Sequence, residues 1–334
     1  MARYANSVMF GFDFQSNAAI VLMIENIAEM KTVRIEGEED IEIGLNDGTY
    51  VLAQAKSVVK ASTDFGNVRA KAETAMTSLS EAAQKMRAKQ LIYITNSPDP
   101  FKDEASKPMF YGNARVKYDV LPDATKEIIS QWLSVIDKPL DTDLLTIQVV
   151  PFETDDDEHR YRVIVDKISE FVGDLDLHEP LYGLHKKLHL VWQDMFDKNG
   201  SKSDRKINLS KKDVVWPVIV FVTSKGLYYD DVERYANIDE GEFEEIRNRY
   251  GELIEDTCEK FDIVVKAITD YGEKRQSDRN SVELFVNEYW GDYVSDFGLE
   301  GVEEPLKSSL AKVILHSILK KKIAINKIKQ SVNL

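Results

Sequence analysis

Hydrophobic and polar residues alternate along Lys31–Ser57, which predicts three short, half-buried strands. The first strand includes Val33–Ile35 and the second runs over Ile41–Leu45. Between the second and third strands, Asn46–Gly48 is a strong turn signal, because Asp and Gly tolerate the backbone angles of a tight hairpin. The third strand, Thr49–Ser57, is therefore expected to run antiparallel beside the second.

Apolar residues that recur every three to four positions predict helices on both sides of these strands. The helices are expected over Phe14–Met30, Val68–Ala88 and Leu121–Ile136. The segment before them, Met1–Asp13, is expected to begin irregularly, with Gly11 as a break.

Two further apolar runs, Leu91–Thr95 and Leu144–Phe152, are typical of buried strands. A helix, a strand hairpin and then alternating helices and strands form a compact α/β domain with a mixed sheet. We predict that this domain covers residues 1–153.

A charged segment, Thr154–Glu158, follows and marks the predicted domain boundary. Beyond it the hydrophobic period becomes helical. The predicted helices are Val163–Val172, Leu181–Phe196, Val214–Thr223, Phe243–Thr269, Val282–Phe297 and Leu306–Ile328. We therefore expect residues 154–334 to form an all-α domain for assembly, in which the apolar face of Leu306–Ile328 docks to partner helices.

Composition places the 334-residue chain among folded globular proteins, and the formal charge is 43 − 58 = −15. The acidic balance argues against a protein covered by nucleic acid. Cys258 is the single cysteine, which excludes disulfide frameworks and cysteine-rich zinc sites. We expect no apolar run to reach the length of a membrane span, so the sequence favours a cytoplasmic protein without membrane contact.

Basic residues gather locally in spite of the net charge. Between Ala55 and Gln90 there are seven Lys or Arg against three acids. Such a strip can bind a phosphate backbone. Its predicted DNA-binding residues are Lys60, Arg69 and Lys71.

The candidate chemistry lies on the hairpin. Gln54 and Lys56 share one side of the third strand, because side chains alternate along a strand. Asp40 is expected on the neighbouring strand. The pattern Asp40 … Gln54-Ala55-Lys56 suits Mg²⁺ (or Mn²⁺), since hard cations prefer oxygen ligands.

In that arrangement the metal ligands are the Asp40 carboxylate, the Gln54 side-chain carbonyl and the Ala55 backbone carbonyl. Lys56 would orient the attacking water and stabilise charge in the transition state. Glu36, Glu39 and Glu42 are also close in sequence, and alternation places Glu42 on the same face as Asp40. The sequence leaves open which of them assists.

Four segments resemble the Cap4-type (DUF4297-like) double-stranded-DNA endonuclease domain, a restriction-endonuclease-like PD-(D/E)xK module of antiphage systems. They are Gly11–Ile20, Ile35-Glu36, Glu39-Asp40-Ile41 and Gln54-Ala55-Lys56-Ser57. The resemblance covers about the first 150 residues. It implies catalytic roles for Asp40, Gln54 and Lys56. It also matches Gln15 to the glutamine at the start of the first helix and Glu36 to the acid before the catalytic Asp.

A short nuclease followed by a helical domain is similar to the nuclease subunit of Lamassu-type (ABC-three-component) defence. This similarity implies an SMC-like ATPase subunit and a small middle subunit as partners, double-stranded DNA as substrate and a homo-oligomer when active. The sequence has no Walker-type loop, so ATP hydrolysis would belong to a partner.

Two other functions fit the same sequence. One is a non-catalytic scaffold with a nuclease-like fold, and the other is a structure-selective repair nuclease. The five histidines all lie beyond residue 153, so the first domain lacks Ser-His and Cys-His chemistry. His185 and His189 have the i, i+4 spacing of zinc ligands, but ordinary helix-face histidines are the favoured interpretation.

Overall fold

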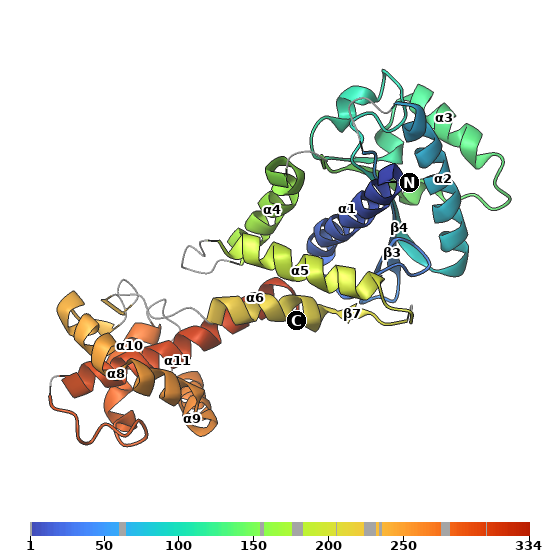
Figure 1. Cartoon of the computed structure of the whole chain (residues 1–334). Coiled ribbons are helices and arrows are strands. Elements are labelled where there is room, and N and C mark those ends of the chain that lie inside the picture. The colour runs from blue at the N-terminus through green and yellow to red at the C-terminus, as the bar shows by residue number, and fades with distance from the viewer. Residues whose placement is uncertain are drawn as a thin grey trace. The chain divides into compact units, whose positions relative to one another are not determined.

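A computed structural model describes residues 2–59, 65–153, 157–175, 183–204, 206–223, 232–233, 236–274, 281–304 and 306–334 (Figure 1). The chain divides into two compact units. The first contains residues 1–218 and 330–334, and the second contains residues 219–329. The predicted division at 153/154 therefore falls inside the first unit.

The first unit has a mixed sheet with helices on both faces, so the predicted α/β class is confirmed. Its elements are α1 (Ala2–Asn26), β1 (Met30–Ile35), β2 (Ile41–Leu45), β3 (Tyr50–Lys56), α2 (Phe65–Lys85), β4 (Ala88–Thr95), η1 (Lys107–Phe110), β5 (Ala114–Lys117), η2 (Tyr118–Val120), α3 (Asp123–Leu133), η3 (Thr142–Leu144), β6 (Leu145–Val149), α4 (Asp157–Asp174), α5 (Leu184–Gly200), β7 (Leu209–Ser210) and α6 (Lys211–Thr223), which runs past the division. The described strands form a seven-stranded sheet in the order β5-β6-β4-β3-β2-β1-β7. The central strands β3, β4 and β6 are parallel, and the outer pairs are antiparallel.

The predicted hairpin is confirmed in its strands and its turn. The backbone N–H of Leu45 donates to the carbonyl of Thr49 (2.9 Å), and Gly48 has φ 78°, which glycine adopts without strain. The acidic residues Glu36–Asp40, however, form a tight connection between β1 and β2 and do not lie on the strands themselves. The N–H of Glu36 closes this connection on the carbonyl of Asp40 (3.1 Å).

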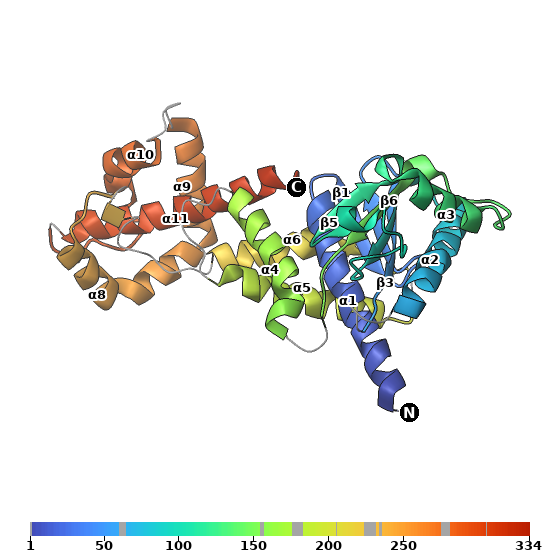
Figure 2. The ribbon, with the colours of Figure 1, turned by 90° about the horizontal axis from the view of Figure 1, so that it is seen from above.

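The helix α1 begins at Ala2 and passes through Gly11, so the expected irregular start and break are wrong. A glycine costs a helix only about 1 kcal/mol relative to alanine, and burial of the following turns outweighs that cost. Residues 18–23 are buried on every side of α1. Figures 1 and 2 show why: α1 lies against the sheet, and α4 and α5 pack along its other side.

One stretch among the described helices, Ser7–Asn26, is long and apolar enough to cross a membrane by length and composition. The expectation that no such run exists is therefore corrected. In this structure 67% of the stretch is buried, as in the core helix of a globular unit.

Residues beyond 153 contribute to the first unit, because α4 and α5 cover α1 and β7 extends the sheet. Leu209 pairs with Val33, and Ser210 pairs with Thr32. The expectation of an all-α second half is thus wrong at β7. A strand of two residues is too short to show alternation, which is why the sequence pattern missed it.

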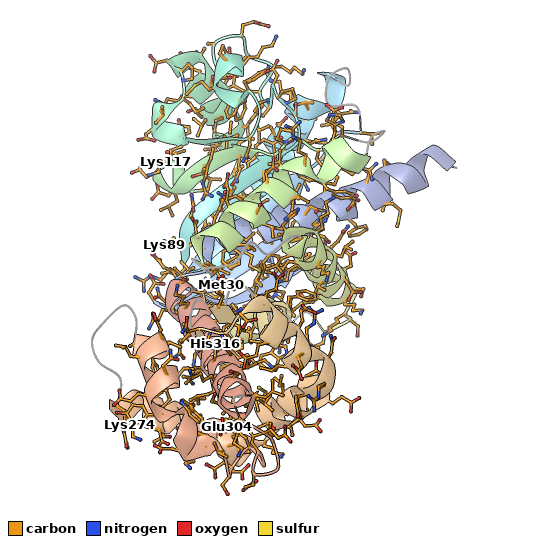
Figure 3. The ribbon with its side chains drawn as sticks, turned by 90° about the vertical axis from the view of Figure 1, so that its left-hand side faces the viewer. Met30, Lys89, Lys117, Lys274, Glu304 and His316 are labelled. Carbon is orange, nitrogen blue, oxygen red and sulfur yellow. The ribbon has the colours of Figure 1, made fainter. Side chains whose placement is uncertain are left out.

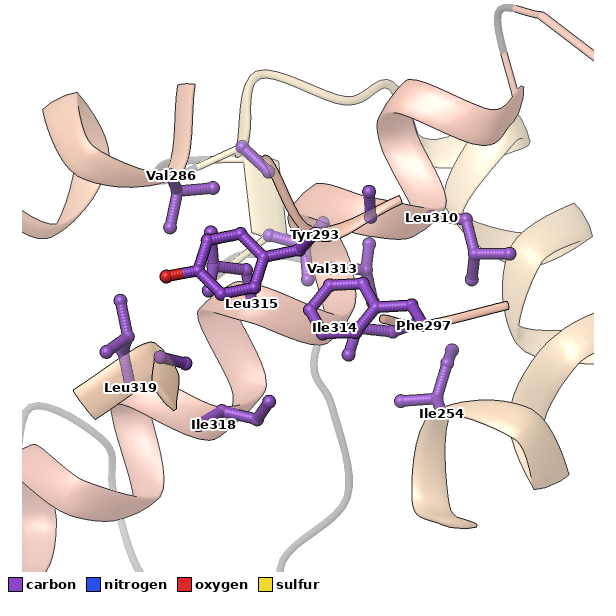
Figure 4. Close-up of a cluster of buried hydrophobic side chains, with 14 of the residues drawn as sticks. Ile254, Val286, Tyr293, Phe297, Leu310, Val313, Ile314, Leu315, Ile318 and Leu319 are labelled. Atoms are coloured by element: carbon purple, nitrogen blue, oxygen red, sulfur yellow. The ribbon is translucent and has the colours of Figure 1, made fainter. Parts of the chain in front are cut away.

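The second unit is helical in its described part and contains α8 (Glu240–Glu259), α9 (Phe261–Lys274), α10 (Ser281–Tyr289), η4 (Trp290–Tyr293) and most of α11 (Leu306–Ser331). The predicted helix Phe243–Thr269 is two helices, since Lys260 is extended (ψ 110°). Figure 4 shows the α11 side chains among the rings of Tyr293 and Phe297, which stack 5.5 Å apart. The apolar face of α11 is thus buried within the second unit, which contradicts its predicted role in docking to a partner.

Candidate functional site

Strand register brings the predicted site residues together. Ile41 pairs with Ala53 across β2 and β3, which places Asp40 opposite Gln54. The Oδ2 atom of Asp40 accepts hydrogen bonds from the Gln54 side-chain amide and from the backbone N–H of Ala55 (2.9 Å). Lys56 Nζ lies 3.9 Å from the same oxygen, and both side chains are about one quarter exposed (27% and 23%). Gln54 is buried, so the group is open to solvent on the side of Asp40 and Lys56.

Gln15, from α1, holds the connection that carries Asp40. Its Nε2 donates to the Glu36 carboxylate (2.9 Å) and to the backbone carbonyl of Asp40 (2.9 Å). Glu36 has φ 58°, an uncommon conformation for a residue with a side chain. Gln15 and Glu36 thus lie beside Asp40 and fix the backbone around it, and a catalytic role for either residue stays a prediction.

Glu42 lies opposite Leu52 on β3, so it shares a face of the sheet with Gln54 and Lys56, as alternation indicates. Its carboxylate pairs with Arg34 on β1 and accepts the backbone N–H groups of Glu38 and Glu39 (3.1 Å from the latter). Gly37 leaves room for this pair, because a Cβ there would collide with the Glu42 carboxylate. The Glu42 carboxylate is thus held by β1 and by the connection between β1 and β2.

Burial raises the pKa of two carboxyl groups in this region. The pKa of Glu39 is raised to about 8, first by desolvation and then by the negative charge of Asp40, while Lys56 acts in the opposite direction. The pKa of Asp40 is also raised by burial, against the effects of Lys56 and the Ala55 N–H. Perturbed carboxyl groups beside a lysine are typical of functional sites.

The donor atoms fit a hard cation. Among the described residues no three His, Cys, Asp or Glu side chains are placed to hold a metal. Mg²⁺ does not require such a group, since it keeps several waters and binds through one or two carboxylates. Gln54 presents its amide nitrogen to Asp40 here. Rotation about its last bond presents the oxygen instead, because the two ends of an amide have nearly the same shape.

The predicted DNA-binding residues have partners within the unit. Lys71 Nζ donates to the backbone carbonyl of Ser57, which ties α2 to the chain just after Lys56. The guanidinium of Arg69 lies over the Trp132 ring, 5.8 Å from its centroid. Lys60 lies outside the described residues. Binding of DNA by these residues stays a prediction.

Asn96, directly after β4, is a buried residue that the sequence analysis did not single out. Its Oδ1 accepts from the backbone N–H of Val58 (2.7 Å), and its Nδ2 donates to the carbonyls of Val58 (2.9 Å) and Phe152 (2.8 Å). It therefore fixes the chain just past Lys56. The signal for it was an Asn-Ser-Pro sequence at the end of an apolar strand.

The other face of α1 carries a separate polar cluster. Its members are Asp13, Asn17, Arg160, Tyr161, His189 and Gln193. His189 Nε2 lies 2.7 Å from Asn17 Oδ1, and burial lowers the pKa of His189 to about 4. His189 is thus a neutral, buried residue that is bonded to α1.

A cavity of about 380 Å³ lies at the opposite end of the sheet, where β4 begins. Its lining includes Glu25, Lys89 and Lys117, of which Figure 3 labels the two lysines. Asp40 and Lys56 do not line it.

Comparison with known proteins gives limited similarity. No family model and no curated protein matches the chain. Among solved structures, the Acinetobacter baumannii Cap4 SAVED/CARF-domain containing receptor is similar in its forms with the cyclic trinucleotides 3'3'3'-cAAA and 2'3'3'-cAAA. For each, the identity is 14% and the TM-score 0.36, over 64% of this chain and 45% of that chain. The chain thus spans less than half the length of these structures.

Proposed function

We propose that the protein is a Mg²⁺-dependent (or Mn²⁺-dependent) endodeoxyribonuclease that cuts double-stranded DNA as the effector of an antiphage defence complex. The observation that carries the activity is the convergence of Gln54, Ala55 and Lys56 on one oxygen of Asp40. The order α1-β1-β2-β3-α2-β4 supports a PD-(D/E)xK assignment, because it places this group at the end of a central strand.

Each residue of the group has a distinct task in this proposal. Asp40 and Gln54 would hold the cation with their side-chain oxygens. The backbone carbonyl of Ala55 would be the third protein ligand. The bound cation supplies charge neutralisation at the phosphate and lowers the pKa of water. Lys56, 3.9 Å from Asp40, is placed to orient a water and to stabilise the negative charge that develops on the phosphate.

The defence role rests on the resemblance of the short motifs to Cap4-type domains. By the same resemblance we propose a cytoplasmic complex with an SMC-like ATPase and a small middle subunit, in which release or rearrangement allows the nuclease to assemble as a homo-oligomer. Coexpression with the products of neighbouring genes, followed by affinity purification, tests this part.

The direct test of the activity is incubation with plasmid DNA and Mg²⁺. We expect cleavage by the wild-type protein, loss of cleavage with EDTA, and at least about a 10²-fold reduction in Lys56→Ala, since removal of one charge-stabilising group typically costs that much. Lys31→Ala is the matched control, because Lys31 is an exposed lysine on β1. Equal cleavage by Lys56→Ala and wild type would contradict the proposal.

A non-catalytic scaffold is the second candidate, and one observation favours it. Asp40 already has two hydrogen-bond donors and a lysine, so the same contacts stabilise the hairpin without a cation. This candidate predicts no Mg²⁺ binding and a lower melting temperature for Asp40→Asn.

A further inference from the structure

The connection between β1 and β2 contains several carboxylates, and most have a clear structural partner. Glu36 accepts from Gln15, and Glu38 is exposed and pairs with Lys85 (2.7 Å). Glu42, at the start of β2, pairs with Arg34 and accepts two backbone N–H groups. These three contacts account for the acids on either side of Glu39 and Asp40.

Glu39 differs from its neighbours. Its side chain is only 5% exposed, and its Oε2 accepts a hydrogen bond from the backbone N–H of Asp40 (3.3 Å). Its Oε1 is buried and accepts no hydrogen bond from the described part of the chain. The hydrogen bond from the Asp40 N–H places this carboxyl directly beside the backbone of the candidate site.

A buried carboxyl oxygen without a partner is costly, typically about 1 to 3 kcal/mol, and native proteins satisfy nearly all such groups. Coordination of a cation removes the cost, because it replaces both the lost hydration and the missing hydrogen bond. The neighbouring Asp40 side chain also offers carboxylate oxygens, which are ligands for the same kind of cation. The two side chains are consecutive in a connection that Gln15 holds in place.

We propose that Glu39 is the second carboxylate ligand of the divalent cation that Asp40 binds. The inference rests on the cation site of the proposed function and assigns it a residue that the motif pattern does not contain. Because the Gln54 side chain is neutral, Glu39 would supply the second negatively charged ligand of the cation.

The test is an EPR titration of the full chain with Mn²⁺, which measures free Mn²⁺ directly and needs no DNA. We expect Glu39→Gln to weaken Mn²⁺ binding by about tenfold or more, because substitution of residues around a bound metal typically lowers its affinity by at least that much. Glu38→Gln is the matched control, because it removes a carboxylate from the same connection but an exposed one. Its affinity should stay within about twofold of wild type, since exposed ion pairs contribute little.

Thermal melting distinguishes a metal-binding role of Glu39 from a purely structural one. Without metal, Glu39→Gln should melt no lower than wild type, because the variant buries a neutral amide in place of a carboxyl. Added Mn²⁺ should raise the melting temperature of wild type and Glu38→Gln but not of Glu39→Gln. If Glu39→Gln does not fold, Glu39→Asp replaces it, and a weakened affinity is again the expected result.

The outcomes are distinct. Wild-type affinity in Glu39→Gln or Glu39→Asp, together with loss of binding in Asp40→Asn, overturns the role of Glu39 and leaves the proposed cation site standing. No Mn²⁺ binding by the wild-type protein overturns both.

Discussion

Two polar clusters contact neighbouring turns of α1 on different faces, and their hydrogen bonding differs. Asp13 and Asn17 bond to each other and to buried or half-buried side chains of α4 and α5. Around Asp40, a carboxylate oxygen of Glu39 is buried without a hydrogen bond from the described chain. A network with matched donors and acceptors holds helices together, whereas an unmatched oxygen beside a surface lysine suits a ligand.

The largest stability effect is expected in the Asp13 cluster. Asp13 accepts from Tyr161 (3.0 Å) and Gln193 (2.9 Å) and pairs with Arg160 (3.6 Å). Asp13→Ala leaves these three donors, and Asn17 Nδ2 (3.0 Å), without this carboxylate, so we expect a loss of about 3 kcal/mol in the free energy of unfolding. Urea unfolding measures it. A loss below about 0.5 kcal/mol, as for an ordinary surface substitution, would show that the cluster does not hold α1 to α4 and α5.

The second prediction concerns pH. The pKa of His189 is about 4 in the folded protein and about 6.5 in the unfolded chain. The unfolded state therefore binds more protons between these values, and stability is lost as pH falls from 6.5 to 4. One pKa unit corresponds to about 1.4 kcal/mol, so this residue accounts for at most about 3.5 kcal/mol.

His189→Gln should remove this part of the pH dependence, as seen in urea unfolding at pH 7 and pH 4.5. His185→Gln, one turn earlier on α5, is the control and should keep it. A pH dependence that is the same in wild type and His189→Gln would refute the assignment of a buried neutral histidine.

A smaller effect on stability is expected at Gln54, where the candidate site has an amide in place of a second carboxylate. Gln54→Glu replaces the amide that donates to Asp40 by a second acid. We expect a loss of about 2 kcal/mol without metal, since a hydrogen bond to a charged group is lost, and recovery with Mg²⁺. Gln148→Glu, a buried glutamine on β6, should lose stability without recovery. Equal behaviour of the two variants with Mg²⁺ would argue against a cation at Gln54.

Local patterns predicted much of the first unit. The turn Asn46–Gly48 and the apolar run Leu91–Thr95 are determined by residues next to each other, so the hairpin and β4 could be identified. The start of α1 could not, because its helix is stabilised by α4 and α5 from far along the chain. For the same reason the unit boundary at 218/219 was missed: α4, α5 and β7 are bound to α1 and β1 by long-range contacts.

The candidate site shows the same limit. Alternation placed Gln54 and Lys56 on one side and strand pairing brought Asp40 to them. Glu39 lies in a tight connection whose backbone Gln15 holds, and Glu42, just after it, pairs with Arg34. Those partners come from α1 and β1, and the sequence pattern carries no information on such contacts.

Plasmid cleavage in Mg²⁺ by Asp40→Asn and Asp13→Asn, measured well below the melting temperature of each variant, tests the central claim most directly. The account predicts that Asp40→Asn stays folded and loses cleavage by at least about 10²-fold, while Asp13→Asn melts earlier and cuts like the wild type. Cleavage by Asp40→Asn at the wild-type rate would contradict the claim that Asp40, Gln54 and Lys56 form the active site.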